Sequence, residues 1–177
     1  DLGRFPDGTD EVDDALAAAL RASRIESEPR PDIMRWKYRK LVNNLGNAVQ
    51  ALCGARLQTE AAREVLDLLV AEAEKALSAA GIDPVTEAED DLRRADHLQL
   101  QPVAGEPRAG GSTWQSLQRG TAVETDFLNG EIALLGRLHG VPTPVNAGIQ
   151  HLMHEAAARG DGPGTLSPNE LLARLVP

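Results

Sequence analysis

The chain has 177 residues, a formal net charge of −9 at pH 7, and 42% apolar but only 3% aromatic residues. An acidic chain lacks the broad basic face that general nucleic-acid binding requires, and no apolar run approaches the ~20 residues of a membrane-spanning helix. Abundant Ala and Leu, with few β-branched and aromatic residues, predict a mainly α-helical fold.

The cysteine content and the start of the chain bear on its cellular compartment. Cys53 is the only cysteine, so no disulfide can form within the chain, and no signal-peptide pattern opens the sequence. We therefore expect a cytoplasmic protein in which Cys53 is buried as a small apolar residue. Because Asp1 is not a natural initiator, we also expect the chain to be processed or cut from a longer one.

The first 30 residues predict a strand, a helix and a second strand. Residues 2–8 have the pattern of a strand end and a turn, residues 10–23 have helical spacing, and residues 25–28 suit a short strand before Pro29. Such a unit is too small to form a core alone. We interpret it as the edge of an α/β domain whose body lies outside this chain.

Three helices are predicted between Pro31 and the middle of the chain. The first covers residues 31–54, with apolar residues three or four apart and Gly54 as a stop signal. The second covers residues 59–80, with Thr59 as its N-cap. The third starts at Asp83-Pro84 and fades near residues 98–100. The segment 101–111, which is rich in Gly and Pro, is expected to be a loop.

Two capping boxes predict the next helix starts, Ser112-x-x-Gln115 and Thr121-x-x-Glu124. In each, the hydroxyl accepts an unpaired backbone N–H and the long side chain reaches back. Gly120 separates the two helices.

Glycine and proline also define the remaining helices. Gly140 ends the helix that begins near Thr121, and Thr143-Pro144 begins another that reaches about residue 158. The run Ser167-Pro168-Asn169-Glu170 caps a short last helix. The result is a helical domain of roughly 145 residues, a usual size for one domain.

One stretch of the chain is basic. Residues 34–57 contain five basic side chains and no Asp or Glu, in a chain whose net charge is −9. The five are Arg35, Lys37, Arg39, Lys40 and Arg56. We call this stretch the basic island, and it predicts a site for a small anion.

Positions three or four apart on the helix over residues 31–54 place Lys37, Lys40, Asn44 and Asn47 on one stripe. One interpretation is a solvated face whose Asn side chains bond to neighbouring helices. The other is a pocket in which the Asn side chains hold an oxyacid while a Lys ammonium delivers a proton.

In this stripe and in motifs farther along the chain, the sequence resembles the C-terminal helical domain of the ketopantoate reductase (2-dehydropantoate 2-reductase) family. The motifs that carry the resemblance span most of residues 32–154 in the family's order. They are Trp36-Lys37, Lys40, Asn44, Asn47-Ala48-Val49-Gln50-Ala51-Leu52, Ser112-Thr113-Trp114-Gln115, Glu124-Thr125-Asp126, Asn129-Gly130, Gly140-Val141-Pro142-Thr143-Pro144 and Asn146.

The resemblance implies a fold and a division of the chain. Family members join an NADPH-binding Rossmann domain to a helical domain of the 6-phosphogluconate-dehydrogenase-like type. Residues 1–30 would be the tail of a truncated Rossmann domain, and residues 31–177 the helical substrate-binding and catalytic domain. No G-x-G-x-x-G follows a strand in this chain, so NADPH would be bound mainly by the missing N-terminal domain.

The resemblance also implies roles for individual residues. The catalytic lysine would be Lys40, with Lys37 as a rival, because the spacing from Lys40 to the two Asn residues is four and then three whereas the family usually has four and four. Asn44, Asn47 and Ser112 would bind substrate. Glu124 would be the active-site glutamate, although its pattern alone favours a capping box with Thr121. Ser112 could likewise be an N-cap, and the cap and ligand roles are not exclusive.

The implied activity is the NADPH-dependent reduction of a small 2-oxo acid, ketopantoate to pantoate, in pantothenate and coenzyme A synthesis. A homodimer is possible. We expect no metal site, because His151 and His154 share a helix face without a third ligand motif. Two alternatives stay open: a reductase of another 2-oxo acid, and a non-catalytic helical module for dimerisation or ligand binding.

Overall fold

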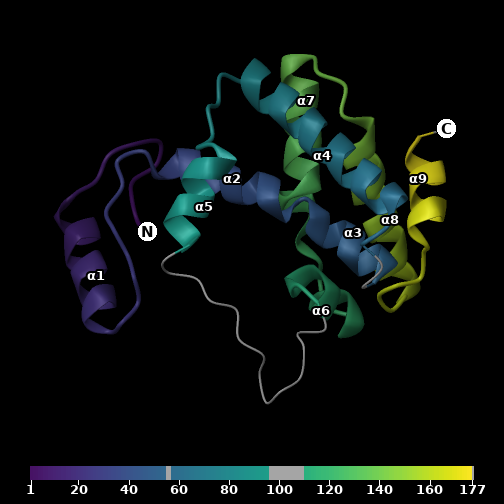
Figure 1. The fold of residues 1–177 in the computed structure, drawn as a ribbon, viewed down its shortest axis with the longest axis horizontal. Coiled ribbons are helices and arrows are strands. Elements are labelled where there is room, and N and C mark those ends of the chain that lie inside the picture. Colours follow the sequence, from purple (N-terminus) through teal and green to yellow (C-terminus); the bar gives the residue numbers. More distant parts are fainter. Residues whose placement is uncertain (55–56, 96–109, 177) are drawn as a thin grey trace. The chain divides into compact units, whose positions relative to one another are not determined.

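The computed structural model describes residues 1–54, 57–95 and 110–176, whose fold is mainly helical as predicted (Figure 1). None of the helices in these ranges is long and apolar enough to cross a membrane. The elements are α1 (Glu11–Ala22), α2 (Ile33–Asn44), α3 (Gly46–Cys53), α4 (Glu60–Ala79), α5 (Glu87–Ala95), α6 (Ser112–Gln118), the 3-10 helix η1 (Glu124–Phe127), α7 (Asn129–His139), α8 (Pro144–Arg159) and α9 (Pro168–Leu175).

The described residues pack as two compact units. Unit 1 contains Asp1–Leu41 and residues 83–95, and unit 2 contains Val42–Ile82 and residues 110–176. The sequence-based division into residues 1–30 and 31–177 follows the family resemblance rather than packing, and it stays a prediction.

In unit 1 the predicted helix after the first turn is confirmed. Asp10 caps α1 by accepting the backbone N–H groups of Val12 and Asp13, and Asp13 reaches back to the N–H of Asp10. The two predicted short strands are wrong: residues 1–30 contain no strand, and one isolated parallel bridge joins Leu2 to Pro29, which follows the segment predicted as the second strand. The pairing stops there because the backbone N–H of Arg4 donates to the carbonyl of Gly8, within its own turn, at 2.9 Å.

Helix α5 begins four residues later than predicted, at Glu87. Its first turn is capped by Thr86 and Glu89: the hydroxyl of Thr86 accepts the N–H of Glu89 at 3.2 Å, and the Glu89 carboxylate accepts the N–H of Thr86 at 2.7 Å. In the segment before it, the carbonyls of Asp83 and Val85 accept hydrogen bonds from arginines of α2, as described below. The predicted fading of this helix near 98–100 and most of the predicted loop at 101–111 lie outside the described residues.

The single helix predicted over residues 31–54 is wrong, because the structure divides it into α2 and α3 at Leu45. The backbone N–H of Leu45 bonds to Val42 three residues back, at 3.2 Å, instead of four. Its carbonyl accepts the side-chain amide of Asn129 at 3.4 Å. A side chain that enters the hydrogen-bond ladder of a helix is a known cause of such a break.

Unit 2 has a core formed by α3, α4, α7 and α8, which lie against one another (Figure 1). Leu52, Leu69, Ile132, Ile149 and Met153 supply it, and each is at most 2% exposed. Burying one such side chain stabilises a fold by about 1.5–3 kcal/mol. The core therefore holds α3, which carries Asn47, and the helices α7 and α8, against which η1 with Glu124 packs.

The helix ends of unit 2 test four capping predictions. Two are confirmed: Thr59 caps α4, and Ser167 with Glu170 forms the capping box of α9. The boxes at Ser112 and Thr121 are wrong. Ser112 is already the first residue of α6, which follows Gly111.

Thr121 belongs to the end of α6 rather than to a new helix. Its N–H and its hydroxyl both donate to the carbonyl of Ser116, at 3.0 and 3.2 Å. The N-cap of the turn that contains Glu124 is Val123, and no side chain caps it. The predicted helix from Thr121 to Gly140 is instead the short η1 followed by α7, which ends at Gly140 as expected.

Candidate functional site

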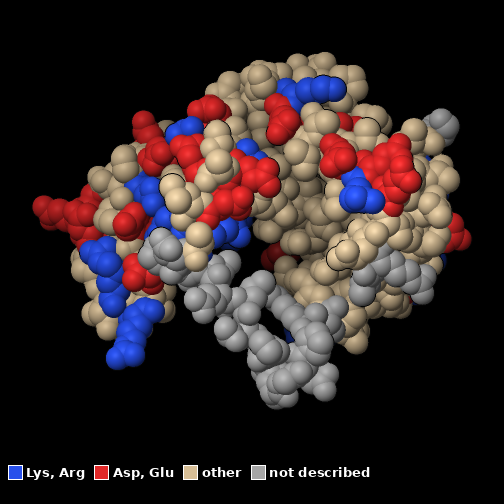
Figure 2. Space-filling view, viewed as in Figure 1, with Lys and Arg blue, Asp and Glu red and all other residues tan. Residues whose placement is uncertain are grey.

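Arg35 and Arg39 of the basic island both contact the segment before α5. Arg35 pairs with Asp83 at 2.9 Å and donates from Nε to the carbonyl of Asp83 at 3.0 Å. Arg39 donates from Nε to the carbonyl of Val85 at 2.7 Å. Basic and acidic side chains are mixed over α1, α2 and α5 (Figure 2). Arg35 and Arg39 thus hold the segment before α5, and the charge of Arg35 is also paired with Asp83; Arg56 lies outside the described residues.

The lysines of the island differ from its arginines. Lys37 and Lys40 are exposed, and both lie in the part of α2 that belongs to unit 1. No hydrogen bond or ion pair joins their ammonium groups to another described residue. The ammonium groups of both lysines are therefore free to meet a ligand.

Asn44 and Asn47 are half-buried and belong to unit 2. Leu45 keeps helical dihedral angles, φ −59° and ψ −33°, although the helix is interrupted there. Asn47 therefore still follows Asn44 by about one turn. The alignment of these two Asn residues with Lys37 and Lys40, which belong to unit 1, stays a prediction.

The structure brings Asn47 close to the start of α6, which carries Ser112. The backbone N–H of Gly111 donates to Oε1 of Gln50 at 2.7 Å. A Cβ atom placed on Gly111 would lie 3.7 Å from Oδ1 of Asn47 and 3.2 Å from Oε1 of Gln50. Two segments that are about 60 residues apart in sequence thus meet, with the exposed Ser112 next to the contact.

Glu124 is the first residue of η1 and is exposed. Its carboxylate has no hydrogen bond or ion pair with another described residue. The alternative interpretation of Glu124 as half of a capping box is therefore wrong.

The neighbouring Asp126 ties η1 to α8. One carboxylate oxygen accepts the side-chain amide of Gln150 at 2.6 Å and pairs with Nε2 of His154 at 2.7 Å. The hydrogen bond from Gln150 lowers the pKa of Asp126, and His154 adds to this effect. The turn that presents Glu124 is therefore anchored on a core helix. His151, by contrast, pairs with Glu155 at 3.0 Å.

A buried polar network supports this scaffold, and sequence reasoning missed it. Glu72 of α4 accepts the backbone N–H groups of Val145 and Asn146, at 2.8 and 2.9 Å, and the side-chain amide of Asn146 at 2.9 Å. Oδ1 of Asn146 in turn accepts the amide of Asn129 at 3.2 Å. The available signal was a Glu in the otherwise apolar stripe of α4, where Leu69 and Ala76 are fully buried.

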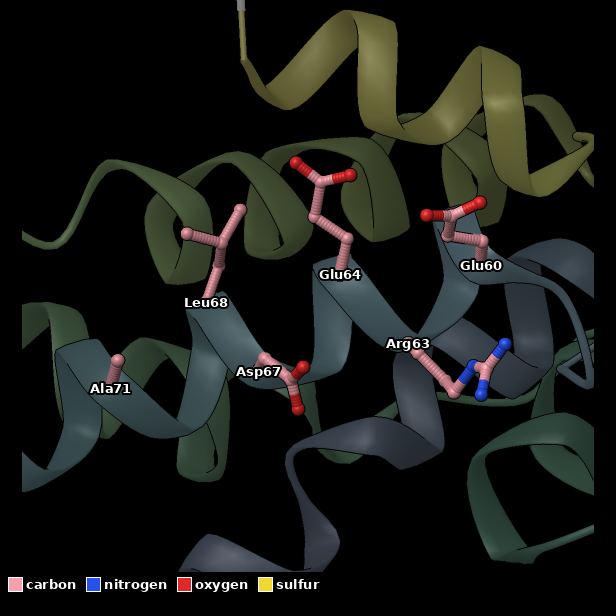
Figure 3. Close-up of a pocket in the computed structure, with 6 residues that line it drawn as sticks. All are labelled: Glu60, Arg63, Glu64, Asp67, Leu68 and Ala71. Carbon is pink, nitrogen blue, oxygen red and sulfur yellow. The ribbon is translucent and has the colours of Figure 1, made fainter.

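Two hollows of unit 2 are lined by other residues. One, of about 660 Å³, follows the face of α4. It is lined by Glu60, Arg63, Glu64, Asp67, Leu68 and Ala71. Figure 3 shows Glu60 and Glu64 pointing to one side of the helix and Arg63 and Asp67 to the other. Three carboxylates against one guanidinium disfavour an anionic ligand there.

The second hollow, of about 240 Å³, lies between the end of α6 and the end of α8. Its lining includes Leu117, Thr121 and Asp161, and none of the predicted site residues. Neither hollow is therefore the predicted oxyacid site. The meeting of Lys40 with Glu124, which belong to different units, stays a prediction.

Comparison with known proteins agrees with the motifs. Residues 32–157 match the family model described as ketopantoate reductase PanE/ApbA C terminal. A 2-dehydropantoate 2-reductase from Caulobacter vibrioides is 31% identical over 147 residues, which cover 81% of this chain and 49% of the relative. The chain thus spans about half the length of this relative.

Solved structures share the fold. A PanE/ApbA family ketopantoate reductase from Ralstonia eutropha JMP134 has a TM-score of 0.65 and 25% identity, over 83% of this chain and 49% of that one. D-mandelate dehydrogenase in a ternary structure with NADH and anilino(oxo)acetate has a TM-score of 0.66 and 20% identity, over 82% and 48%. A dimeric ketopantoate reductase from Staphylococcus aureus has a TM-score of 0.65 and 18% identity, over 85% and 52%. With the family model matched over residues 32–157, this chain belongs to the ketopantoate reductase family as its C-terminal domain.

Proposed function

We propose that this chain is the substrate-side part of an NADPH-dependent 2-oxo acid reductase that converts ketopantoate to pantoate. The observation that carries the proposal is the family match over residues 32–157, because that range includes every candidate site residue. This activity would place the protein in pantothenate and coenzyme A synthesis, in the cytoplasm.

The proposed chemistry is reduction of a carbonyl group. NADPH, when bound, supplies the hydride. The former carbonyl oxygen then carries negative charge, and the ammonium of Lys40 stabilises this charge and gives the oxygen a proton. Lys37, three residues earlier on α2, is the rival donor.

The remaining candidate residues bind the substrate or orient the catalytic lysine. The side-chain amides of Asn44 and Asn47 and the hydroxyl of Ser112 hold the oxyacid by hydrogen bonds. The closeness of Asn47 to the start of α6 supports a shared role for these two segments. Glu124, free of other described partners, orients the lysine or accepts a hydrogen bond from a substrate hydroxyl.

The cofactor requires a second domain in this proposal. A dinucleotide is usually held by a glycine-rich turn between a strand and a helix, and the described residues contain only the isolated bridge between Leu2 and Pro29. We propose that a Rossmann domain, to which residues 1–30 belong, binds most of NADPH. We also propose a homodimer, since a fold neighbour from Staphylococcus aureus is dimeric.

A second candidate function is the reduction of a different 2-oxo acid. It is favoured by the fold likeness to D-mandelate dehydrogenase, whose structure holds NADH and anilino(oxo)acetate. A non-catalytic helical module is the third possibility.

Substrate competition separates these candidates. The experiment measures kcat/KM for ketopantoate and for several other 2-oxo acids, each with NADPH and with NADH, in the protein that contains this chain and a nucleotide-binding domain. We expect the highest value for ketopantoate with NADPH. A higher value for another oxo acid would favour the second candidate, and the absence of any reductase activity would favour the third.

A further inference from the structure

The 3-10 helix η1 points three neighbouring side chains in three directions. A 3-10 helix has three residues per turn, so successive side chains stand about 120° apart. Thr125 is fully buried, and Asp126 contacts α8 through its carboxylate. Glu124 takes the third direction and is exposed. The direction in which Glu124 points therefore depends on the two neighbours that fix η1.

Asp126 has two partners on α8, and they differ in burial. Nε2 of Gln150 donates to Oδ1 of Asp126 at 2.6 Å. Nε2 of His154 lies 2.7 Å from the same oxygen, but the side chain of His154 is 50% exposed. Gln150 is one turn earlier on α8 and is half-buried. Gln150 is thus the more buried of the two residues that hold Asp126.

A glycine of α7 makes room for the Gln150 side chain. Gly130 is a buried residue in the first turn of α7. A Cβ atom placed on Gly130 would lie 2.6 Å from Nε2 of Gln150 and 3.0 Å from its Cδ. Non-bonded heavy atoms normally stay about 3.5–4.0 Å apart. A side chain at position 130 would therefore displace the amide group that donates to Asp126.

We propose that Gln150, lying against the bare backbone of Gly130, is a positioning residue for Glu124. Gln150 holds Asp126, and Asp126 fixes the turn from which Glu124 projects. This role rests on the proposed function of Glu124 and adds the groups that place its carboxylate. A displacement of about 1 Å in an active site can cost about 10²-fold in rate. Because the contact with Asp126 is half exposed, we expect a smaller loss of about fivefold to tenfold.

Gly130→Ala tests this role without removing a polar group. The Gln150 amide is the end of a flexible side chain and can move aside, and Ala is a better helix former than Gly. The variant should therefore stay folded, which circular dichroism checks. In the intact reductase, kcat/KM for ketopantoate with NADPH should fall about fivefold to tenfold.

Gly148→Ala is the matched control. Gly148 is a helical glycine of α8, and a Cβ atom placed on it would lie 2.6 Å from Cδ2 of Leu175 on α9. The substitution therefore crowds the end of a flexible side chain as Gly130→Ala does, but this side chain does not hold η1. Its kcat/KM should stay within about twofold of the wild type.

A double-mutant cycle separates placement of Glu124 from a general loss of structure. Glu124→Ala alone should lower kcat/KM more than about tenfold, because a charged hydrogen-bonding group is lost. If Gly130→Ala acts through Glu124, adding it to Glu124→Ala should change kcat/KM by less than about twofold. A purely structural role would lower kcat/KM by the same factor in both backgrounds.

A second variant tests the hydrogen bond itself. Gln150→Glu keeps the shape of the side chain but replaces its donor with a carboxylate that repels Asp126. It should reproduce the loss of Gly130→Ala, again only when Glu124 is present, and it decides alone if Gly130→Ala does not fold. Asp126→Asn keeps an acceptor oxygen for Gln150 and should stay within about threefold of the wild type.

Two results would overturn this role. They are wild-type kcat/KM in a folded Gly130→Ala or Gln150→Glu variant, and an undiminished loss when either substitution is added to Glu124→Ala. In both cases a loss in Glu124→Ala alone leaves the proposed function standing. Full activity of Glu124→Ala would instead remove the proposed role of Glu124, and the positioning role with it.

Discussion

The backbone N–H of Gly111 donates to Oε1 of Gln50 at 2.7 Å, which joins the start of α6 to α3. Asn47, one turn before Gln50, lies beside the same glycine. Gln50 thus fixes where Ser112 stands relative to Asn47. In the proposed reductase this makes Gln50 a positioning residue for two groups that hold the substrate.

Replacing Gln50 tests this positioning role. Gln50→Ala removes the acceptor of the Gly111 N–H, which costs about 1 kcal/mol. If this loss weakens substrate binding by the same free energy, KM should rise about fivefold. We expect kcat to change less, because Gln50 does not touch the reacting atoms. Gln50→Glu keeps an acceptor oxygen and should restore the start of α6, which the NMR chemical shift of the Ser112 amide reports. Equal losses of kcat and of kcat/KM with an unchanged KM would contradict this role.

Glu72 is expected to be the most sensitive polar residue for stability. Glu72→Ala leaves three donors of Val145 and Asn146 without their acceptor in a buried place. An unsatisfied buried group costs about 1–3 kcal/mol, so the free energy of unfolding should fall by at least about 2 kcal/mol in a urea titration. Glu74→Ala, at an exposed position on the same helix, is the matched control and should stay within about 0.5 kcal/mol of the wild type. Similar losses in both variants would refute the network's importance.

Asp126 should make the stability of the chain depend on acid pH. Its pKa is lowered in the folded state, first by the hydrogen bond from Gln150 and then by His154. A lowered carboxyl pKa contributes stability that is complete above the ordinary pKa of about 3.9 and is lost as the pH falls through the folded value. The contribution is small because the Asp126 and His154 side chains are 51% and 50% exposed.

The measurement compares unfolding free energies of the wild type and Asp126→Asn between about pH 3 and pH 7. The difference between the two proteins should be largest near neutral pH and should shrink below about pH 4. A difference that is constant over this range would show that the Asp126 carboxylate does not contribute in this way.

Local sequence signals predicted a large part of the fold. The starts of α4 and α9 follow from cap residues, α1 follows from helical spacing, and α8 follows from Thr143-Pro144, because each signal acts within a few residues. The errors arose where distant residues decide. Asn129 reaches the carbonyl of Leu45 and interrupts the first predicted helix, and Arg39 holds Val85 and delays α5.

Local sequence signals predicted only part of the candidate site. The spacing of Lys37, Lys40 and Asn44 on one helix follows from helical periodicity, and α2 confirms it. The contact of Asn47 with the start of α6 depends on tertiary packing, so only the family resemblance pointed to it. Glu72 was missed because a carboxylate that caps a distant helix leaves no local pattern beyond a charge among apolar neighbours.

The most direct test of the account compares two neighbouring lysines in the intact reductase. The measurement is kcat/KM for ketopantoate with NADPH in Lys40→Ala and in the matched control Lys37→Ala, both at exposed positions of α2. If Lys40 delivers the proton, its loss should lower kcat/KM by about 10²–10⁴-fold, whereas loss of Lys37 should leave it within about threefold. A Lys40→Ala enzyme that keeps full activity would contradict the central claim, and the reverse pattern would transfer the role to Lys37.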